Sequence, residues 1–436
     1  MTSKAGPKII TCVASDLLSA LEIAASVRPR AITVNGDTGF VVAADVAAGG
    51  RVYSVGESST VACPFVVREA SDGVALVLPP AVRNSLRSHG DGLIKVSCLV
   101  DRSTCSITIA GPGGSSSFKT PSPASLRYRR DDPPVADDAF GKPIPAGILR
   151  AALVGAHPFV SKDGKAEPET RTIQIFDSAN PSYSKGDGTL YASDGISAYY
   201  FYSSAFVGRA MTLHADDLDV AIKLTGYAGT IRAAAGNEPR LLSDVGTRLW
   251  GSRCKPREQY NYYPRKVEGY RYTLARAALV SMIQEAVTPM RSDRPCVRLL
   301  FEHRRRTLRI EVAAKGRTIK SHAIPILRHA VLEDRDIDVA VVPHMMFRLL
   351  ETAQAPEVEL RLMLIPPPEG RPREGFTLRT IEHFWADAEG RVVAAGNAPQ
   401  PTPDSYECRV TAFVTGEGPA VSVPIGASNA ASDSSK

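Results

Sequence analysis

Hydrophobic residues recur at two spacings along this chain. Three stretches place leucine, isoleucine and alanine three or four positions apart, which is the spacing of an amphipathic helix. They begin at Ser15, Pro145 and Leu274 and read SDLLSALEIAAS, PAGILRAALVGA and LARAALVSMIQEAV. Serine and aspartate commonly cap a helix, and proline is favoured in its first turn. We therefore predict an amphipathic helix at each of the three places. Ser15-Asp16 is the predicted cap of the first helix.

A second pattern also occurs three times. In each copy an alternating strand leads through a short turn into a leucine-rich helix and then into another strand. The copies read VALVLPPAVRNSLRSHGDGLIKVSCLV, AMTLHADDLDVAIKLTGYAGTIRAAA and VAVVPHMMFRLLETAQAPEVELRLML. The first pattern has equivalent positions at Leu21, Leu153 and Leu279, separated by 132 and 126 residues, and the second at Leu78, Leu213 and Val342, separated by 135 and 129. Two sets of landmarks thus give one period near 130 residues, which predicts three repeats.

Each repeat is expected to contain two helices and about eight strands. Polar turns divide the strand-rich runs, as in RLLFEHRRRTLRIEV, where two strands flank EHRRRT. Helices on one face of antiparallel sheets define an α+β fold class. Linker-like segments at 119–143 and near Pro264–Gly269 place the domains at 1–139, 140–267 and 268–425, and the small polar tail 426–436 has the composition of a disordered segment.

Composition narrows the class of protein. The 436 residues are 44% hydrophobic and 22% charged, which excludes a disordered or fibrous chain. A net charge of +6 permits a polyanionic partner without requiring one. Seven cysteines without CxxC spacing indicate reduced thiols, and no signal-like or membrane-spanning stretch is evident. We expect a soluble cytoplasmic protein with no membrane partner.

The residues of the repeats resemble a known family. GTLYASDGISAYYF resembles a strand–Ala-Thr-Asp-Gly–strand segment of the bacterial DNA sliding clamp, the β subunit of the replicative DNA polymerase. RPCVRLLFEHRRRTLRIEV resembles the strand pair after the first helix of that family's third domain, with Val297, Arg298 and Leu299 in matching places. Arg28-Pro29 matches the Arg-Pro after its first helix. The resemblance covers about residues 8–365.

The resemblance implies a three-domain chain that forms half of a six-domain ring, pairing head to tail with a second copy. Such a ring holds double-stranded DNA without reading its sequence, which requires cations spread over several inward-facing helices. The predicted DNA-binding residues are Arg28, Arg83, Arg87, Arg150, Lys162, Arg171, Lys223, Arg276, Arg291, Arg294 and Arg348. The alternative is that these side chains belong to ordinary solvated helix faces.

The resemblance also implies a pocket for linear peptide motifs of DNA polymerase and the clamp loader, between the second and third repeats. The matching residues are Ser193, Asp194, Gly195, Ile196, Pro264, Val267, Val342 and Met345. The family has a basic residue and leucine after its Asp-Gly, whereas this chain has Ile196, Ser197 and Ala198. In the family a C-terminal strand closes the same pocket. This chain has two candidates for that strand, in 407–418 and 420–425. Met345, Met346 and Phe347 could equally be core residues.

Motifs that carry catalytic chemistry are not found. GPGGSSS (111–117) lacks the lysine of a phosphate loop, and there is no GxSxG or HExxH motif. Asp216, Asp217 and Asp219 suit a helix N-terminus, and His157, His214 and His344 are expected to be structural. We predict no catalytic function, metal or cofactor. Two alternatives to a sliding clamp are a clamp-like protein that recruits or sequesters replication factors without encircling DNA, and an unrelated three-domain β-rich scaffold.

Overall fold

The computed structural model of the chain describes most of its residues, which are called the described part. It comprises residues 7–27, 39–46, 49–56, 59–101, 104–121, 140–176, 188–195, 197–234, 239–255, 269–287, 297–314, 317–331, 336–341, 343–353, 355–365, 375–386, 392–396 and 404–414. The chain divides into two compact units, each described by itself. Unit 1 spans 1–192, 203–260 and 386–392, and unit 2 spans 193–202, 261–385 and 393–436.

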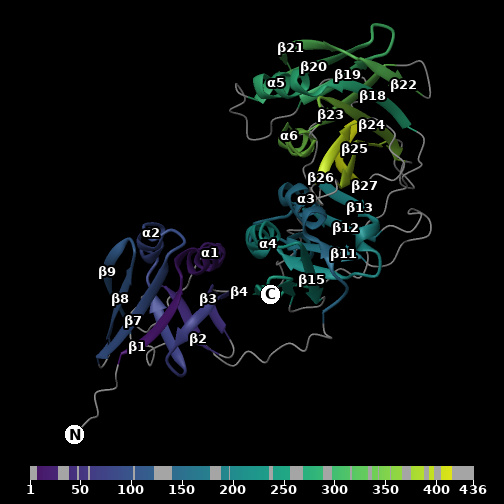
Figure 1. Ribbon diagram of the computed structural model, residues 1–436. Helices are drawn as coiled ribbons and strands as arrows, with labels where there is room; N and C mark the ends of the chain where they lie inside the picture. Colours follow the sequence, from purple (N-terminus) through teal and green to yellow (C-terminus); the bar gives the residue numbers. More distant parts are fainter. Residues whose placement is uncertain are drawn as a thin grey trace, which may run out of the picture. The chain divides into compact units, whose positions relative to one another are not determined.

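The first repeat lies in unit 1. Its elements are β1 (Lys8–Val13), α1 (Ala14–Ala24), β2 (Phe40–Asp45), β3 (Gly49–Val55), β4 (Thr60–Phe65), β5 (Val67–Ala70), β6 (Val74–Leu78), α2 (Val82–Arg87), β7 (Leu93–Asp101), β8 (Thr104–Gly111) and β9 (Gly114–Pro121). Antiparallel pairing gives the strand orders β5-β1-β7-β8-β9 and β6-β2-β3-β4. Helix α1 packs on α2 and on strands β3 and β4, so the helices cover the sheets from one side (Figure 1).

The second repeat begins in unit 1 with the same order of elements. They are β10 (Ile144–Pro145), α3 (Ala146–Ala156), β11 (Thr172–Phe176), β12 (Gly188–Ser193), β13 (Ser197–Ser203), β14 (Met211–His214), α4 (Leu218–Thr225), β15 (Thr230–Ala234), β16 (Arg240–Ser243) and β17 (Arg248–Trp250). Short 3-10 turns at His157–Phe159, Pro168–Arg171, Ser204–Phe206 and Ala215–Asp217 connect them. Within unit 1 the strand orders are β14-β11-β12 and β10-β15-β16-β17, and α3 packs on α4.

The third repeat lies in unit 2. Its elements are β18 (Gly269–Ala275), α5 (Arg276–Val287), β19 (Val297–Glu302), β20 (Thr307–Ala314), β21 (Arg317–Pro325), β22 (Arg328–Ala330), β23 (Ile337–Val341), α6 (Pro343–Thr352), β24 (Glu357–Ile365), β25 (Gly375–Ala386), β26 (Val392–Gly396) and β27 (Asp404–Val414). The strand orders are β22-β18-β24-β25 and β13-β27-β23-β19-β20-β21, and β25 also pairs with β27. Helices α5 and α6 pack on each other.

The predicted threefold repetition is confirmed. Leu21, Leu153 and Leu279 lie in the first helix of their repeats, and each is 0% exposed. Leu78 ends β6 and Leu213 lies in β14, the strands that lead into the second helices, and both are also fully buried. Val342, the third landmark of that set, is outside the described residues. The chain therefore has the expected α+β architecture of helix pairs on antiparallel sheets.

The first helices begin differently from the prediction. Val13 is the N-cap of α1 without a side-chain hydrogen bond, so Ser15 and Asp16 lie inside the helix. Pro145 precedes α3, and Leu274 lies in β18 before α5 begins. The reason is the same in all three repeats, because the first helical amide donates to a carbonyl beyond the second helix. The bonds are Ala14 N to Gly92 O at 3.0 Å, Ala146 N to Gly229 O at 2.9 Å and Arg276 N to Pro356 O at 2.9 Å.

Two strand pairs join elements that belong to different repeats in sequence. In unit 1, β17 pairs with β4 in antiparallel register from Arg248↔Ala62 to Trp250↔Thr60. This pair extends the sheet to eight strands over the first and second repeats. In unit 2, β13 pairs with β27 from Ser197↔Val410 to Tyr202↔Ser405. Each junction is thus formed by backbone hydrogen bonds between sheet edges.

Several predictions lie outside the described residues. The domain boundaries after residues 139, 267 and 425 fall within or beside segments that the structure does not describe, and so does the tail 426–436. They stay predictions. In the described part, no helix is both long and apolar enough to cross a membrane. Cys12, Cys63, Cys98, Cys105 and Cys254 are free and buried.

Candidate functional site

Two of the three predicted DNA-binding cations of the first repeat, Arg83 and Arg87, lie on α2. Arg83 and Arg87 are four positions apart, so they share a helix face. Arg83 Nε donates to the carbonyl of Pro80 at 3.4 Å. Arg87 Nη2 is 3.1 Å from Glu22 Oε1 of α1, yet the arginine side chain remains 58% exposed. A pair this exposed is weak, so the guanidinium stays available to a phosphate.

The second repeat presents Arg150 on α3 and Lys223 on α4, both exposed. A Cβ added to Gly226, the C-cap of α4, would lie 3.1 Å from Arg150 Nη1. The guanidinium therefore lies over the C-terminal end of α4, where the helix dipole favours a cation. Helices α3 and α4 pack on each other, so Arg150 and Lys223 belong to one helix pair.

Lys162 takes part in a short polar chain instead of standing alone. Its Nζ lies 3.1 Å from His157 Nε2. The same ring nitrogen is 3.2 Å from Asp219 Oδ1, at the start of α4. The predicted structural role of His157 fits this arrangement, since the imidazole links the residues after α3 to α4.

Two predicted cations of the third repeat, Arg276 and Arg348, make hydrogen bonds within the fold. Arg276 Nε donates to the Leu350 carbonyl at 3.1 Å and so joins α5 to α6. Arg348, on α6, donates through Nη1 to Asp194 Oδ2. The sequence predicts Arg348 for the DNA surface and Asp194 for the peptide pocket, and the structure brings the two side chains together. Arg28, Arg291 and Arg294 lie outside the described residues, so their assignment stays a prediction.

The Ser-Asp-Gly segment forms the predicted tight turn between β12 and β13. Asp194 Oδ1 accepts from Ser197 N at 2.7 Å and from Ser197 Oγ at 3.0 Å. Ser193 Oγ donates to the Ser197 carbonyl at 2.8 Å and accepts from Gly195 N at 3.1 Å. Gly195 has a φ of 92°, which a side chain would disfavour. Together with Arg348, these bonds hold the turn in one conformation.

Other predicted pocket residues are only partly described. Ile196, Pro264, Val267 and Val342 are outside the described residues, and Met345 lies in α6 with an undescribed side chain. Met346 is 0% exposed, which supports the core alternative for that position. Of the two candidate C-terminal strands, residues up to Val414 of the segment 407–418 belong to β27, beside β13. Residues 420–425 lie outside the described part.

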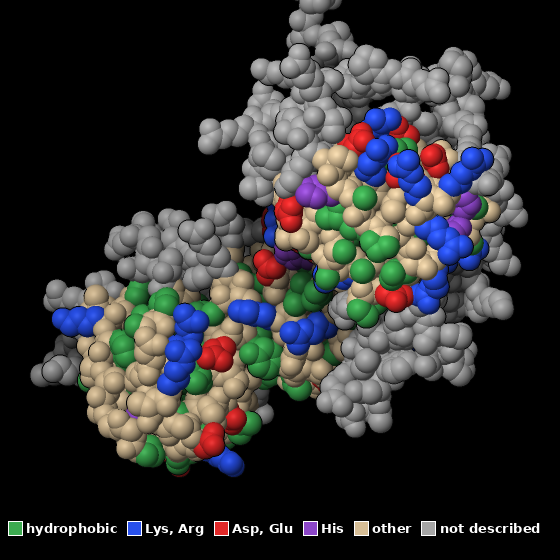
Figure 2. Space-filling view, turned by 90° about the horizontal axis from the view of Figure 1, so that it is seen from above, with side chains coloured by type: hydrophobic (Ala, Val, Ile, Leu, Met, Phe, Trp, Pro, Cys, Tyr) green, Lys and Arg blue, Asp and Glu red, His purple; other side chains and the backbone are tan. Residues whose placement is uncertain are grey.

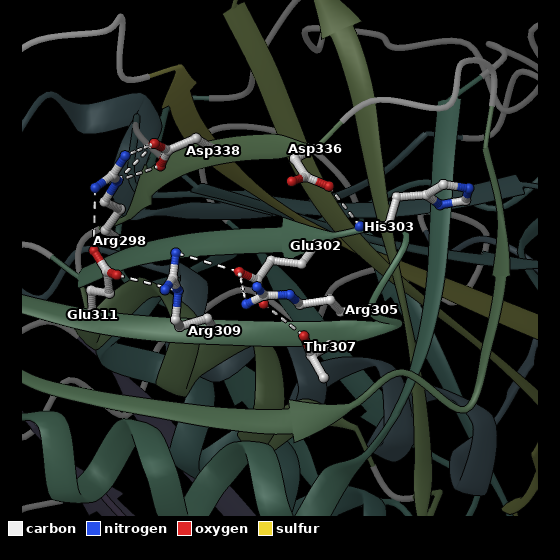
Figure 3. A network of polar contacts seen from close by, with 9 residues as sticks. All are labelled: Arg298, Glu302, His303, Arg305, Thr307, Arg309, Glu311, Asp336 and Asp338. Atoms are coloured by element: carbon white, nitrogen blue, oxygen red, sulfur yellow. Dashed lines mark hydrogen bonds and ion pairs between the residues drawn. The ribbon is translucent and has the colours of Figure 1, made fainter.

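Arg298 of β19, Arg309 of β20 and Arg305 of the turn between them belong to a mixed-charge network in unit 2 (Figure 3). Arg298 Nε donates to Asp338 Oδ1 at 2.8 Å, and its Nη1 is 3.2 Å from Glu311 Oε2. Arg309 bridges Glu311 and Glu302 at 3.3 and 3.4 Å. Acidic partners therefore compensate Arg298 and Arg309.

Arg171 lies at a cleft that sequence reasoning did not find. The cleft has a volume of about 450 Å³ and is lined by the loop 164–168, Arg171, His214 and the segment 253–255. Arg171, the ring of His214 and the segment that carries Arg253 and Lys255 come from separate parts of the second repeat. No local motif connects them, so only the fold could reveal them. His214 had been expected to be structural.

Cations on the visible surface are dispersed. In the face shown in Figure 2, Lys and Arg side chains stand in several small groups between hydrophobic and uncharged ones. In the described part, no group of three or more His, Cys, Asp or Glu side chains is placed to hold a metal ion.

Three copies of a helix pair on antiparallel sheets, joined edge to edge, define a sliding-clamp fold. The comparison with solved structures confirms the expected fold. The chain is similar to the β sliding clamp of Caulobacter crescentus (TM-score 0.68, 14% identity, 94% of this chain and 100% of that chain). It is also similar to the DNA polymerase III β subunit of Thermotoga maritima (0.67, 13%, 93% and 99%).

A third similar structure is the sliding clamp of Bartonella birtlesii bound to griselimycin (TM-score 0.69, 13% identity, 93% of this chain and 99% of that chain). No family model matches the sequence, and no curated protein matches it. The likeness is thus one of fold, kept over nearly the whole chain while the sequences have diverged.

Proposed function

We propose that this protein is a DNA sliding clamp: two copies close head to tail into a ring around duplex DNA and tether DNA polymerase and other partners to it. The observation that carries the proposal is the use of sheet edges within the chain. This observation depends on two features of the described part: the order of strands and helices in each repeat, and the strands that lie at the edges of the sheets.

The two internal junctions follow one rule. β4 is the third strand after the first helix of its repeat, and β17 is the third strand after the second helix of the next repeat; these two strands pair. β13 is likewise the third strand after α3, and it pairs with β27, the last described strand after α6. A strand after a first helix thus joins a strand after a second helix of the following repeat.

Two equivalent strands remain. β9 is the third strand after α2 and ends the order β5-β1-β7-β8-β9, and β21 is the third strand after α5 and ends the order β13-β27-β23-β19-β20-β21. The same rule pairs β9 of one copy with β21 of another. Because the two edges lie in the first and third repeats, this contact is head to tail, and two copies with six repeats suffice to close it.

The helix pairs provide the surface toward DNA in this proposal. Arg83, Arg87, Arg150 and Lys223 lie on α2, α3 and α4, and charges spread over separate helices hold a duplex without fixing its register. Closure around DNA makes the tether topological, which keeps an attached polymerase at high effective concentration near its primer. No catalytic step is required of the clamp.

Partner recognition is proposed at the Ser193–Gly195 turn and α6. A linear peptide motif of a polymerase or clamp loader would bury apolar side chains there, and Ile196 replaces the family's basic residue. The griselimycin complex is a property of the Bartonella clamp and suggests only that this fold offers a peptide-sized site.

The decisive experiment is loading on a nicked circular plasmid followed by linearisation. A ring slides off the ends after the plasmid is cut, whereas a protein bound in a groove stays. The alternative function, recruitment without encirclement, predicts that no protein remains with the intact circle at high salt. Retention on circles and loss on linear DNA would exclude this alternative.

A further inference from the structure

The cleft in the second repeat gathers hydrogen-bond donors. Arg171 and His214 lie at it, between the loop 164–168 and the segment 253–255, which contributes Arg253, Cys254 and Lys255. Among the described residues that line it there is no aspartate or glutamate. A volume of about 450 Å³ is in the range of small-ligand sites, so the cleft has room for more than a single water or ion.

Arg171 is incompletely paired. Its side chain is 20% exposed, and its Nη2 lies 3.3 Å from Asp216 Oδ2, beside the cleft. Its Nε is buried and has no hydrogen-bond partner. An unmet donor on a mostly buried cation costs free energy, and an oxyanion in the cleft supplies the missing acceptor, directly or through a water.

His214 adds a neutral donor. Its Nδ1 accepts a hydrogen bond from the Asp216 amide at 3.2 Å, which leaves the proton of the neutral ring on Nε2. Burial lowers the pKa of His214, so the ring is neutral near pH 7. The imidazole can therefore donate to an anion without placing a second charge at a buried position.

The remaining groups also suit an anion. Lys255 Nζ is 3.3 Å from Glu169 in a pair whose side chains are 68% and 46% exposed, a weak pair that a ligand can displace. Burial raises the pKa of the Cys254 thiol to about 11, so it stays protonated and does not repel an anion. The buried carboxylate of Asp217 is directed to Ser252, accepting from its amide at 2.5 Å and its hydroxyl at 3.0 Å.

We propose that this cleft binds a phosphate group, with Arg171, Arg253 and Lys255 as its charged ligands and His214 as a neutral donor. Planar guanidinium groups match tetrahedral oxyanions through paired hydrogen bonds, and several converging cations favour phosphate over a monovalent carboxylate. The phosphate can come from a free nucleotide or from a nucleic-acid backbone. The proposal does not depend on ring closure, since all of its residues belong to one repeat.

The test is calorimetric titration of the full chain with inorganic phosphate and pyrophosphate. We expect saturable binding by the wild type. The affinity should fall about tenfold in R253Q and in R171Q, because each variant loses one charge-assisted hydrogen bond to the phosphate. R68Q, which removes an exposed arginine from β5, is the matched control and should bind as the wild type does. If R171Q fails to fold, K255Q provides a second exposed position.

Competition then identifies the source of the phosphate. Displacement of pyrophosphate by a deoxynucleoside monophosphate supports a free-nucleotide site, and displacement only by a short duplex oligonucleotide supports a backbone site. Absence of binding by the wild type, or equal binding by wild type, R253Q and R171Q, overturns the proposal. Neither result bears on whether the chain is retained on circular DNA.

Discussion

Arg348 of α6 donates to Asp194 Oδ2, while the other carboxylate oxygen of Asp194 accepts two hydrogen bonds from Ser197. The side chains are 33% and 14% exposed, so the pair is partly shielded from water. One carboxylate therefore organises the turn before β13 and attaches that turn to a helix of the third repeat. A mobile turn at this point would leave the proposed peptide site without a fixed wall.

The Arg348–Asp194 pair should show measurable coupling. In a double-mutant cycle with R348Q and D194N, we expect a coupling free energy of about 1 kcal/mol. This value is smaller than for a fully buried ion pair, because solvent partly screens the two charges. The measurement is the free energy of unfolding in urea. The exposed pair Arg328–Glu357, 62% and 41% exposed, is the control, and its cycle should give a smaller value. Equal coupling in both cycles would contradict the structural role of Asp194.

Ser117 of β9 tests the proposed ring edge. It lies opposite Thr108, three pairs from the hairpin turn at Gly111↔Gly114, so alternation directs its amide away from β8. S117P removes that donor and should shift the dimer toward monomer in light scattering, while S117A keeps the amide and should leave the dimer intact. A dimer that persists in S117P at the same protein concentration would exclude this edge.

Charge reversal on α2 tests the proposal that the helix pairs face DNA. The double variant R83E/R87E should be retained less on nicked circular DNA and show a shallower salt dependence, by about 0.9 in slope for each lost phosphate contact. Retention on plasmid over a series of salt concentrations is the measurement. R68E changes an exposed arginine on β5 and should retain the wild-type slope. Unchanged retention of the double variant would place α2 away from DNA.

Asp217 holds the first two repeats together. It is 0% exposed, and it hydrogen-bonds Ser252 and also Ser59 of the first repeat. D217N replaces one acceptor oxygen by a donor that faces another donor, so we expect a loss of about 2 kcal/mol in the free energy of unfolding. D216N, at a half-exposed carboxylate, should cost less. Equal urea midpoints for D217N and wild type would contradict this role.

Acid should weaken unit 1 through His214. Burial lowers the pKa of this ring below its usual value, so the unfolded chain takes up its proton first. The stability from the neutral ring is present above the unfolded pKa of about 6.5 and is lost as the pH falls below it. H214N keeps an acceptor for the Asp216 amide and should flatten the decline of the urea midpoint between about pH 7.5 and 5.5. A parallel decline in both proteins would assign the effect to other groups.

The repeats were predictable because their signal is local. A leucine every three or four positions defines a helix face within a dozen residues, and Leu21, Leu153 and Leu279 all proved to be buried. The helix starts were not predictable, since the amide of Ala14 is capped by Gly92 and not by a neighbouring side chain. The same limit applies to the candidate sites.

A turn was predictable where one segment carries all of its residues, whereas the use of those residues as a peptide pocket stays a prediction. Ser193, Asp194 and Gly195 form a turn within three residues, and the sequence placed them correctly in that turn. The cation that binds Asp194 lies 154 positions away, and nothing near Arg348 in the sequence indicates it. The cleft at Arg171 and His214 is still harder to foresee, because separate loops assemble it.

The continuous pairing of β4 with β17 has a consequence for synthesis and proteolysis. A nascent or proteolysed chain that ends before Arg248 lacks β17. Strand β4 is then an unpaired edge strand, with amides and carbonyls that have no hydrogen-bond partner. Such fragments should associate with each other or with chaperones instead of folding as independent modules. Truncated forms of this protein should therefore be soluble only when β4 and β17 are both present in the same fragment.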